Sequence, residues 1–152
     1  MSVIDSVMAS AHLLFAGLWT GSVLFTAYAV LPTALAGEVN AEPLGAIVGK
    51  LKTVSRASAL LLLLSGGHLA GTRYTAESLF GTPRGYLVLA MVALWFILAA
   101  LVEIGSSKLT DGLDQNKVRT PAHDAKPFFT AAAVVALLLL VDAGLLLGGL
   151  PF

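Results

Sequence analysis

Two of the three histidines stand inside long apolar stretches, where lipid makes an ionisable side chain costly. Met8 precedes His12 by four residues, so their side chains share one face of a helix. His68 and Met91 lie in two further apolar stretches. Imidazole and thioether groups are ligands that suit a soft cation such as Cu(I). These residue types therefore predict a metal site that binds copper.

Asp142 adds a carboxylate to this set. Helical depth, at about 1.5 Å per residue, places Asp142 with His12 and His68 in the outer half of a membrane. Asp142 is then a further metal ligand, or it accepts the His12 imidazole N–H and fixes the tautomer. Simpler readings stay open: packing for the methionines, interfacial water for His68, and a hydrogen bond to serine or threonine for His12.

The same histidines allow a second chemistry. Haem iron commonly takes His or Met as axial ligands, and the interior of a helical bundle is a usual cofactor site. Under this alternative, His12 and His68 bind haem b. Trp19, which lies on the same helix face as His12, packs against the haem. The protein would then be a redox protein or a membrane oxidase. A third alternative is an assembly subunit without metal, whose polar groups satisfy one another.

Arg56 and Glu103 are expected at a different depth in the membrane from the histidines, toward the cytoplasmic side. An ion pair between them would relieve two charges inside the membrane. We interpret the pair as structural, with a gate as the alternative.

The composition defines the elements that must position these residues. Hydrophobic residues make up 57% of the chain and charged residues 12%, against about 25% charged in soluble domains. This balance predicts an all-α, multi-pass protein of the cell membrane in contact with the lipid bilayer. The net charge of +0 gives no indication of nucleic-acid binding, and the absence of cysteine excludes thiolate sites. No motif of hydrolytic chemistry occurs, so an enzyme is expected only under the haem alternative.

Four apolar stretches reach the roughly 20 residues that a spanning helix needs. Pro32 is expected to end the first, and Lys50 and Lys52 place the first turns of the second in the interface. Because backbone groups in lipid must bond internally, we predict one domain, residues 1–152, folded as a four-helix membrane bundle. Its spans are residues 6–31, 44–71, 85–108 and 127–148.

Basic residues set the predicted orientation. Those at one end are Lys50, Lys52, Arg56, Lys108, Lys117, Arg119 and Lys126, whereas the other end has Arg73 and Arg84. The positive-inside rule therefore places both termini on the non-cytoplasmic side.

Glycines recur at a spacing of four residues. The pairs are Gly17 and Gly21, Gly45 and Gly49, Gly67 and Gly71, and Gly144 and Gly148. Such pairs let helix backbones approach closely, so they predict tight packing in the bundle and a face for a homodimer.

One pattern resembles a known family. The stretch "HLLFAGLWTG" has the form H-x6-W-x-G, and Pro32 follows it. It is similar to the first span of the copper resistance D family, and "VSRASALLLLLSGG" resembles the helix of that family in which an arginine precedes an apolar run. The resemblance implies copper handling at the membrane. A haem-associated family that oxidises protoporphyrinogen has similar spans, but its additional basic residues after the tryptophan are missing here.

Overall fold

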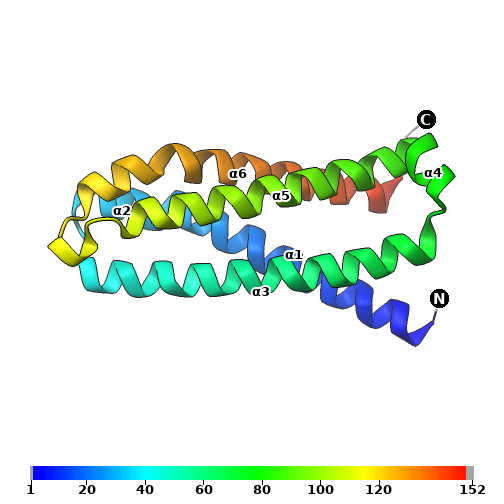
Figure 1. Ribbon diagram of the computed structural model, residues 1–152, viewed down its shortest axis with the longest axis horizontal. Coiled ribbons are helices and arrows are strands. Elements are labelled where there is room, and N and C mark those ends of the chain that lie inside the picture. The colour runs from blue at the N-terminus through cyan, green and yellow to red at the C-terminus, as the bar shows by residue number, and fades with distance from the viewer. Residues whose placement is uncertain (1, 150–152) are drawn as a thin grey trace.

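The structure, a computed structural model, describes residues 2–149. All its regular elements are helical, and long helices run side by side along the long axis of the molecule (Figure 1). The elements are α1 Val3–Phe25, the π-helical turn η1 Thr26–Val30, α2 Leu31–Ala36, α3 Ala41–Arg73, α4 Ala76–Gly81, α5 Pro83–Thr110, the 3₁₀ turn η2 Leu113–Gln115 and α6 Arg119–Gly148.

The first helical run passes through Pro32 without stopping, which contradicts the sequence-based expectation. A proline lacks the N–H for an α-helical bond, and its ring crowds the carbonyl four residues back. The π turn η1 ends at Val30, two residues before Pro32, and a π turn is one way in which a helix accommodates such a disruption. The run ends instead at Gly37, whose φ of 74° is left-handed. Its N–H bonds the Ala34 carbonyl oxygen at 3.0 Å, as at many helix ends.

The later helices extend beyond the predicted stretches. α6 begins two turns before its predicted start and carries Pro127 within it. The segment between the second and third predicted spans contains α4, which begins with a capping box of Thr75 and Ser78.

The helices pack as two antiparallel pairs, α1 with α3 and α5 with α6, which meet through α3–α5 and α1–α6 contacts. One stripe of α3 is buried at helical spacing and faces the other helices. Its members are Leu44, Val48, Leu51, Ser55, Ser58, Leu62 and Ser65. This stripe meets the α1 residues Trp19 and Val23 in the core. The α1–α3 contact therefore contains apolar side chains together with serine hydroxyl groups.

Three helical runs within residues 2–149 are long and apolar enough to cross a membrane: Val3–Ala36, Pro83–Gln115 and Arg119–Gly148. Helix α3 is as long, but it is not among them, and Lys50, Lys52 and Arg56 interrupt its apolar sequence. The membrane character of the protein is therefore clear, whereas a fourth span through α3 stays a prediction.

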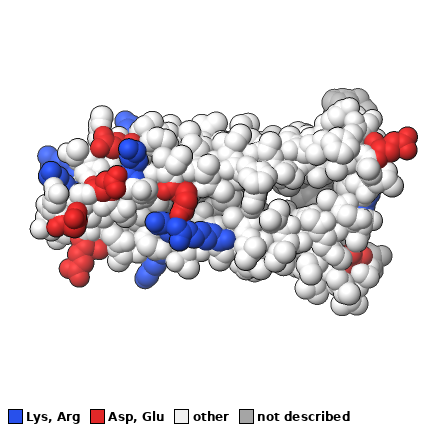
Figure 2. Space-filling model, viewed as in Figure 1, with Lys and Arg blue, Asp and Glu red and all other residues white. Residues whose placement is uncertain are grey.

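Most of the visible charged side chains lie toward one end of the molecule, a few lie at the other end, and the stretch between them is almost bare (Figure 2). We name the end that holds most of them the charged end; it comprises α2, the start of α3, the end of α5, η2 and the start of α6. The opposite end, named the α4 end, holds the start of α1 and the end of α6 (Figure 1). Charged side chains are costly in the hydrocarbon core of a bilayer, so a surface without charge is expected where lipid surrounds the protein.

The paired glycines do not bring these helices together. A Cβ added at Gly17, Gly21, Gly67 or Gly71 would meet nothing within 4 Å, and the same holds at Gly49, Gly144 and Gly148. Gly45 differs, because a Cβ there would stand 3.6 Å from the Leu113 Cδ1. The other seven paired glycines face outward, so the tight packing that they predict does not occur at these positions inside the chain.

Candidate functional site

The antiparallel contact between α1 and α3 carries three hydrogen bonds between side chains. From the α4 end inward they join Asp5 to His68, His12 to Ser65 and Trp19 to Ser55. On α1 these residues recur every seven positions, which keeps them on one face. We name this line of polar contacts the α1–α3 seam.

His12 lies half-buried in this seam, with its Nδ1 2.9 Å from the Ser65 Oγ. The Ser65 hydroxyl has one proton, and it donates that proton to the Leu61 carbonyl oxygen at 2.6 Å. With the hydroxyl proton on the Leu61 bond, Ser65 accepts from His12 Nδ1–H, and the lone pair of the neutral imidazole is then on Nε2. Gly66 makes room for the ring, because a Cβ there would stand 2.9 Å from His12 Cε1.

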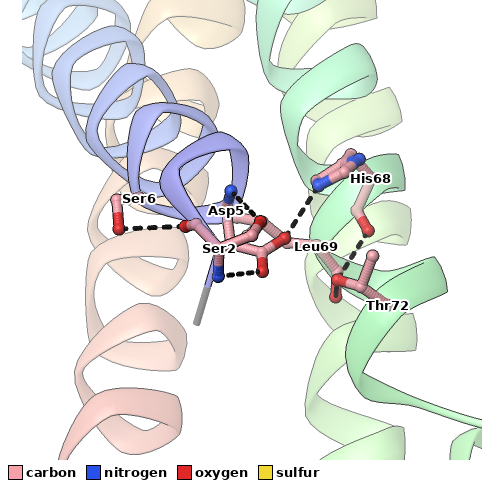
Figure 3. Close-up of polar contacts among 6 residues, drawn as sticks. All are labelled: Ser2, Asp5, Ser6, His68, Leu69 and Thr72. Carbon is pink, nitrogen blue, oxygen red and sulfur yellow. Dashed lines mark hydrogen bonds and ion pairs between the residues drawn. The ribbon is translucent and has the colours of Figure 1, made fainter.

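His68 lies nearer the α4 end and is bonded to the first turn of α1 (Figure 3). Its Nε2 is 3.0 Å from Asp5 Oδ1. The other carboxylate oxygen of Asp5 accepts the Ser2 N–H at 2.9 Å, and the Asp5 N–H donates to the Ser2 Oγ at 3.1 Å. This capping box fixes the carboxylate, so the imidazole meets an acceptor that is already oriented.

Trp19 closes the inner part of the seam. Its side chain is 1% exposed, and its Nε1–H donates to the Ser55 Oγ at 2.7 Å. The indole thus packs against the core of the α1–α3 contact, and its one polar group is satisfied there.

Asp142 is 6% exposed, and its Oδ2 has no hydrogen-bond partner within the described part of the chain. Helices α5 and α6 are antiparallel, and Phe129 faces Gly105. Asp142 follows Phe129 by 13 residues, and Val92 precedes Gly105 by 13. Asp142 therefore lies at the level of Val92 and its neighbour Met91. This level is about 20 Å from the Phe129–Gly105 contact, in the direction of the α4 end.

The level of Met91 relative to His12 follows from a bond between α5 and α3. Trp95 Nε1 donates to the Ala59 carbonyl oxygen at 3.1 Å, which sets the register of the two helices. Met91 is four residues from Trp95 toward the α4 end, and Ser65 is six residues from Ala59 in the same direction. Met91 therefore lies within about one turn of the level of His12.

Arg56 and Glu103 contact each other across α3 and α5. The Arg56 Nε donates to both carboxylate oxygens, at 3.1 and 3.4 Å, and the guanidinium Nη2 also bonds Oε1. The side chains are 65% and 42% exposed, so the pair lies at the surface of the helix pairs rather than in their core.

The predicted metal ligands do not form one chelating cluster of nitrogen and carboxylate groups. Among the residues that the structure describes, no three His, Asp or Glu side chains lie close enough to hold one ion. His12 and His68 instead bond to different partners on the opposite helix. Met8 lies between Asp5 and His12 on the seam face of α1, and it is half-buried.

Sequence reasoning missed three partners of these residues: Asp5, Ser55 and Ser65. A signal for them exists, because both serines fall on the helical spacing of the buried stripe of α3. Asp5 precedes His12 by seven residues, a spacing that keeps the two on one helix face. Only the packing of α1 against α3 identifies which side chains Asp5 and the two serines contact.

Comparison with known proteins assigns a family to this arrangement. A family model described as copper resistance protein D matches residues 45–146. The match spans α3, α4, α5 and most of α6, including His68, Met91 and Asp142, whereas His12 and its H-x6-W-x-G pattern precede it. The chain has no significant match among curated proteins or among solved structures. Because the matched region covers more than half of the sequence, the chain belongs to the copper resistance protein D family.

Proposed function

We propose that this membrane protein binds copper and passes it through the membrane, with His12 as the principal ligand. The observation that carries the proposal is the orientation of the His12 imidazole. Its Nδ1–H is held by Ser65, so its Nε2 lone pair is the group that a Cu(I) ion would take. The family to which the chain belongs supplies the choice of metal.

Other side chains support a site around His12. Met91 and Asp142 lie near its level by helix register, and Met8 precedes it by one turn of α1. We propose Met8, Met91 and His68 as further ligands, with Asp142 as a ligand or as a compensating charge. Thioether and imidazole donors favour Cu(I) over the harder divalent cations.

The proposal includes a membrane arrangement. We propose that α3 crosses the cell membrane as the fourth span and that the α4 end, with both termini, faces away from the cytoplasm. The distribution of charge supports this orientation, because six of the nine basic residues lie at the charged end and a seventh, Arg56, lies in the middle of α3. The outward-facing glycine pairs are then available to a second copy of the chain, which would make a homodimer.

The haem alternative gains no support from the contacts of the histidines. A haem iron with two axial histidines needs them on opposite faces of a flat macrocycle. His12 and His68 instead each bond across the same α1–α3 seam. An absorption spectrum of freshly purified protein tests this alternative, and a Soret band lost in His12→Ala would favour haem over copper.

The decisive experiment is a Cu(I) titration of the purified protein against a chromophoric chelator. His12→Ala is expected to abolish tight binding at the His12 site. His123→Ala is the matched control, because His123 is an exposed histidine of the charged end, next to Asp124. Unchanged copper affinity in His12→Ala would overturn the proposal, and a wild-type protein that binds neither copper nor haem would favour an assembly subunit.

A further inference from the structure

In the α1–α3 seam, a hydrogen bond orients the imidazole of His12 and another orients that of His68, and the two bonds have different partners. Each histidine uses one ring nitrogen for a partner on the opposite helix, and each partner is itself fixed. A hydrogen bond of this kind, from the other ring nitrogen to a second group, commonly accompanies a metal-binding histidine. The seam therefore has the features of two prepared ligands.

At His68 the acceptor determines the tautomer. An ionised carboxylate has no proton to donate, so the Nε2 next to Asp5 Oδ1 must carry the hydrogen. The lone pair of the neutral ring is then on Nδ1. Figure 3 shows the Asp5 carboxylate between the Ser2 amide and the His68 ring, so the capping box sets the position of the acceptor.

At His12 the opposite nitrogen is engaged. The Ser65 hydroxyl gives its proton to Leu61 and accepts from His12 Nδ1–H, which leaves Nε2 as the donor atom for a metal. The two histidines thus present different nitrogens, each fixed by a residue that the metal itself would not touch.

The two rings are anchored at separate places. On α1, His12 and the Asp5 partner of His68 are seven residues apart, about 10 Å along the axis. No three His, Asp or Glu side chains of residues 2–149 surround one point. Met8 lies between Asp5 and His12 on the same face of α1.

We propose that the α1–α3 seam holds two separate stations for a soft monovalent cation, an outer one at His68 positioned by Asp5 and an inner one at His12 positioned by Ser65. Met8 lies on the way from the first to the second. The proposal rests on the proposed function and extends it, because it replaces one shared site by two sites used in order. Asp5 and Ser65 are positioning residues in it and bind no metal themselves.

The test combines nitrogen NMR of the histidine rings with Cu(I) and Ag(I) titration of the full chain in lipid nanodiscs. Without metal, His68 is expected as the Nε2–H tautomer and His12 as the Nδ1–H tautomer. The wild-type protein is expected to bind two ions. Metal should shift His68 Nδ1 and His12 Nε2, the two nitrogens that carry lone pairs.

The variants separate the two stations. His68→Gln should remove the outer ion and leave the inner one, and His12→Gln should do the reverse. Asp5→Ala should weaken the outer ion about 10- to 100-fold, as loss of a positioning partner commonly does, with the inner ion unchanged. Asp124→Ala, at the charged end, is the control and should change neither.

Three outcomes distinguish the ideas. One bound ion that either histidine variant abolishes means a shared site, which overturns the two stations but leaves copper binding intact. Equal populations of the two His68 tautomers in both wild type and Asp5→Ala would remove the positioning role of Asp5. No bound ion in the wild-type protein would overturn the proposed function itself.

Discussion

Replacement of Gly66 by alanine should lower the affinity of the protein for copper without changing its stability. The new Cβ would stand 2.9 Å from His12 Cε1, whereas carbon atoms in favourable contact are about 3.5–4.0 Å apart. The His12 imidazole must therefore move away from the new Cβ by about 0.6 Å or more. A shift of that size lengthens the 2.9 Å bond to Ser65 to about 3.5 Å, beyond the range of a good hydrogen bond.

The expected free energies nearly cancel. Alanine in a helix interior is about 0.5–1 kcal/mol more favourable than glycine, and the lost hydrogen bond costs about 1 kcal/mol. Gly66→Ala should thus leave the free energy of unfolding almost unchanged. Its Cu(I) affinity should fall about tenfold, because the ring loses the partner that orients it.

Gly67→Ala is the matched control, because a Cβ at Gly67 would meet nothing within 4 Å. It should gain the helix stabilisation and keep the copper affinity. The assays are denaturant unfolding in detergent micelles and Cu(I) competition on the same preparations. Equal copper affinities in the two variants would refute the reasoning that links Gly66 to the position of the ring.

Three further predictions concern the framework. Ser55→Ala should lower the free energy of unfolding by about 1–3 kcal/mol, measured in the same unfolding assay, because it leaves the buried Trp19 N–H unpaired; an unchanged midpoint would contradict this. Glu103→Gln should have a smaller effect than Ser55→Ala, because the ion pair with Arg56 is exposed; a double-mutant cycle of the pair measures the coupling, and a larger loss would indicate a role as a gate. A phosphatase reporter fused to the N-terminus should be active outside the cytoplasm, and activity of the matched cytoplasmic reporter instead would reverse the proposed orientation.

Much of the fold follows from hydropathy, because lipid leaves a helix as the only way to satisfy the backbone of a single apolar segment. Each apolar stretch predicted from the sequence does lie in a long helix. The helix ends were harder to predict, since they depend on local devices. Pro32 indicates a helix end by its own chemistry, but the π turn before it lets the helix continue to Ala36.

The sequence by itself determined that this is a membrane protein and which residues are costly in lipid: His12, His68 and Asp142 stand out in apolar stretches without any structure. Helical period alone, however, cannot set the rotation of one helix against another. Only the packing of α1 on α3 decided that His12 meets Ser65 and that His68 meets Asp5. The physical reason is that a residue's face follows from its own helix, whereas its partner depends on the register between two helices.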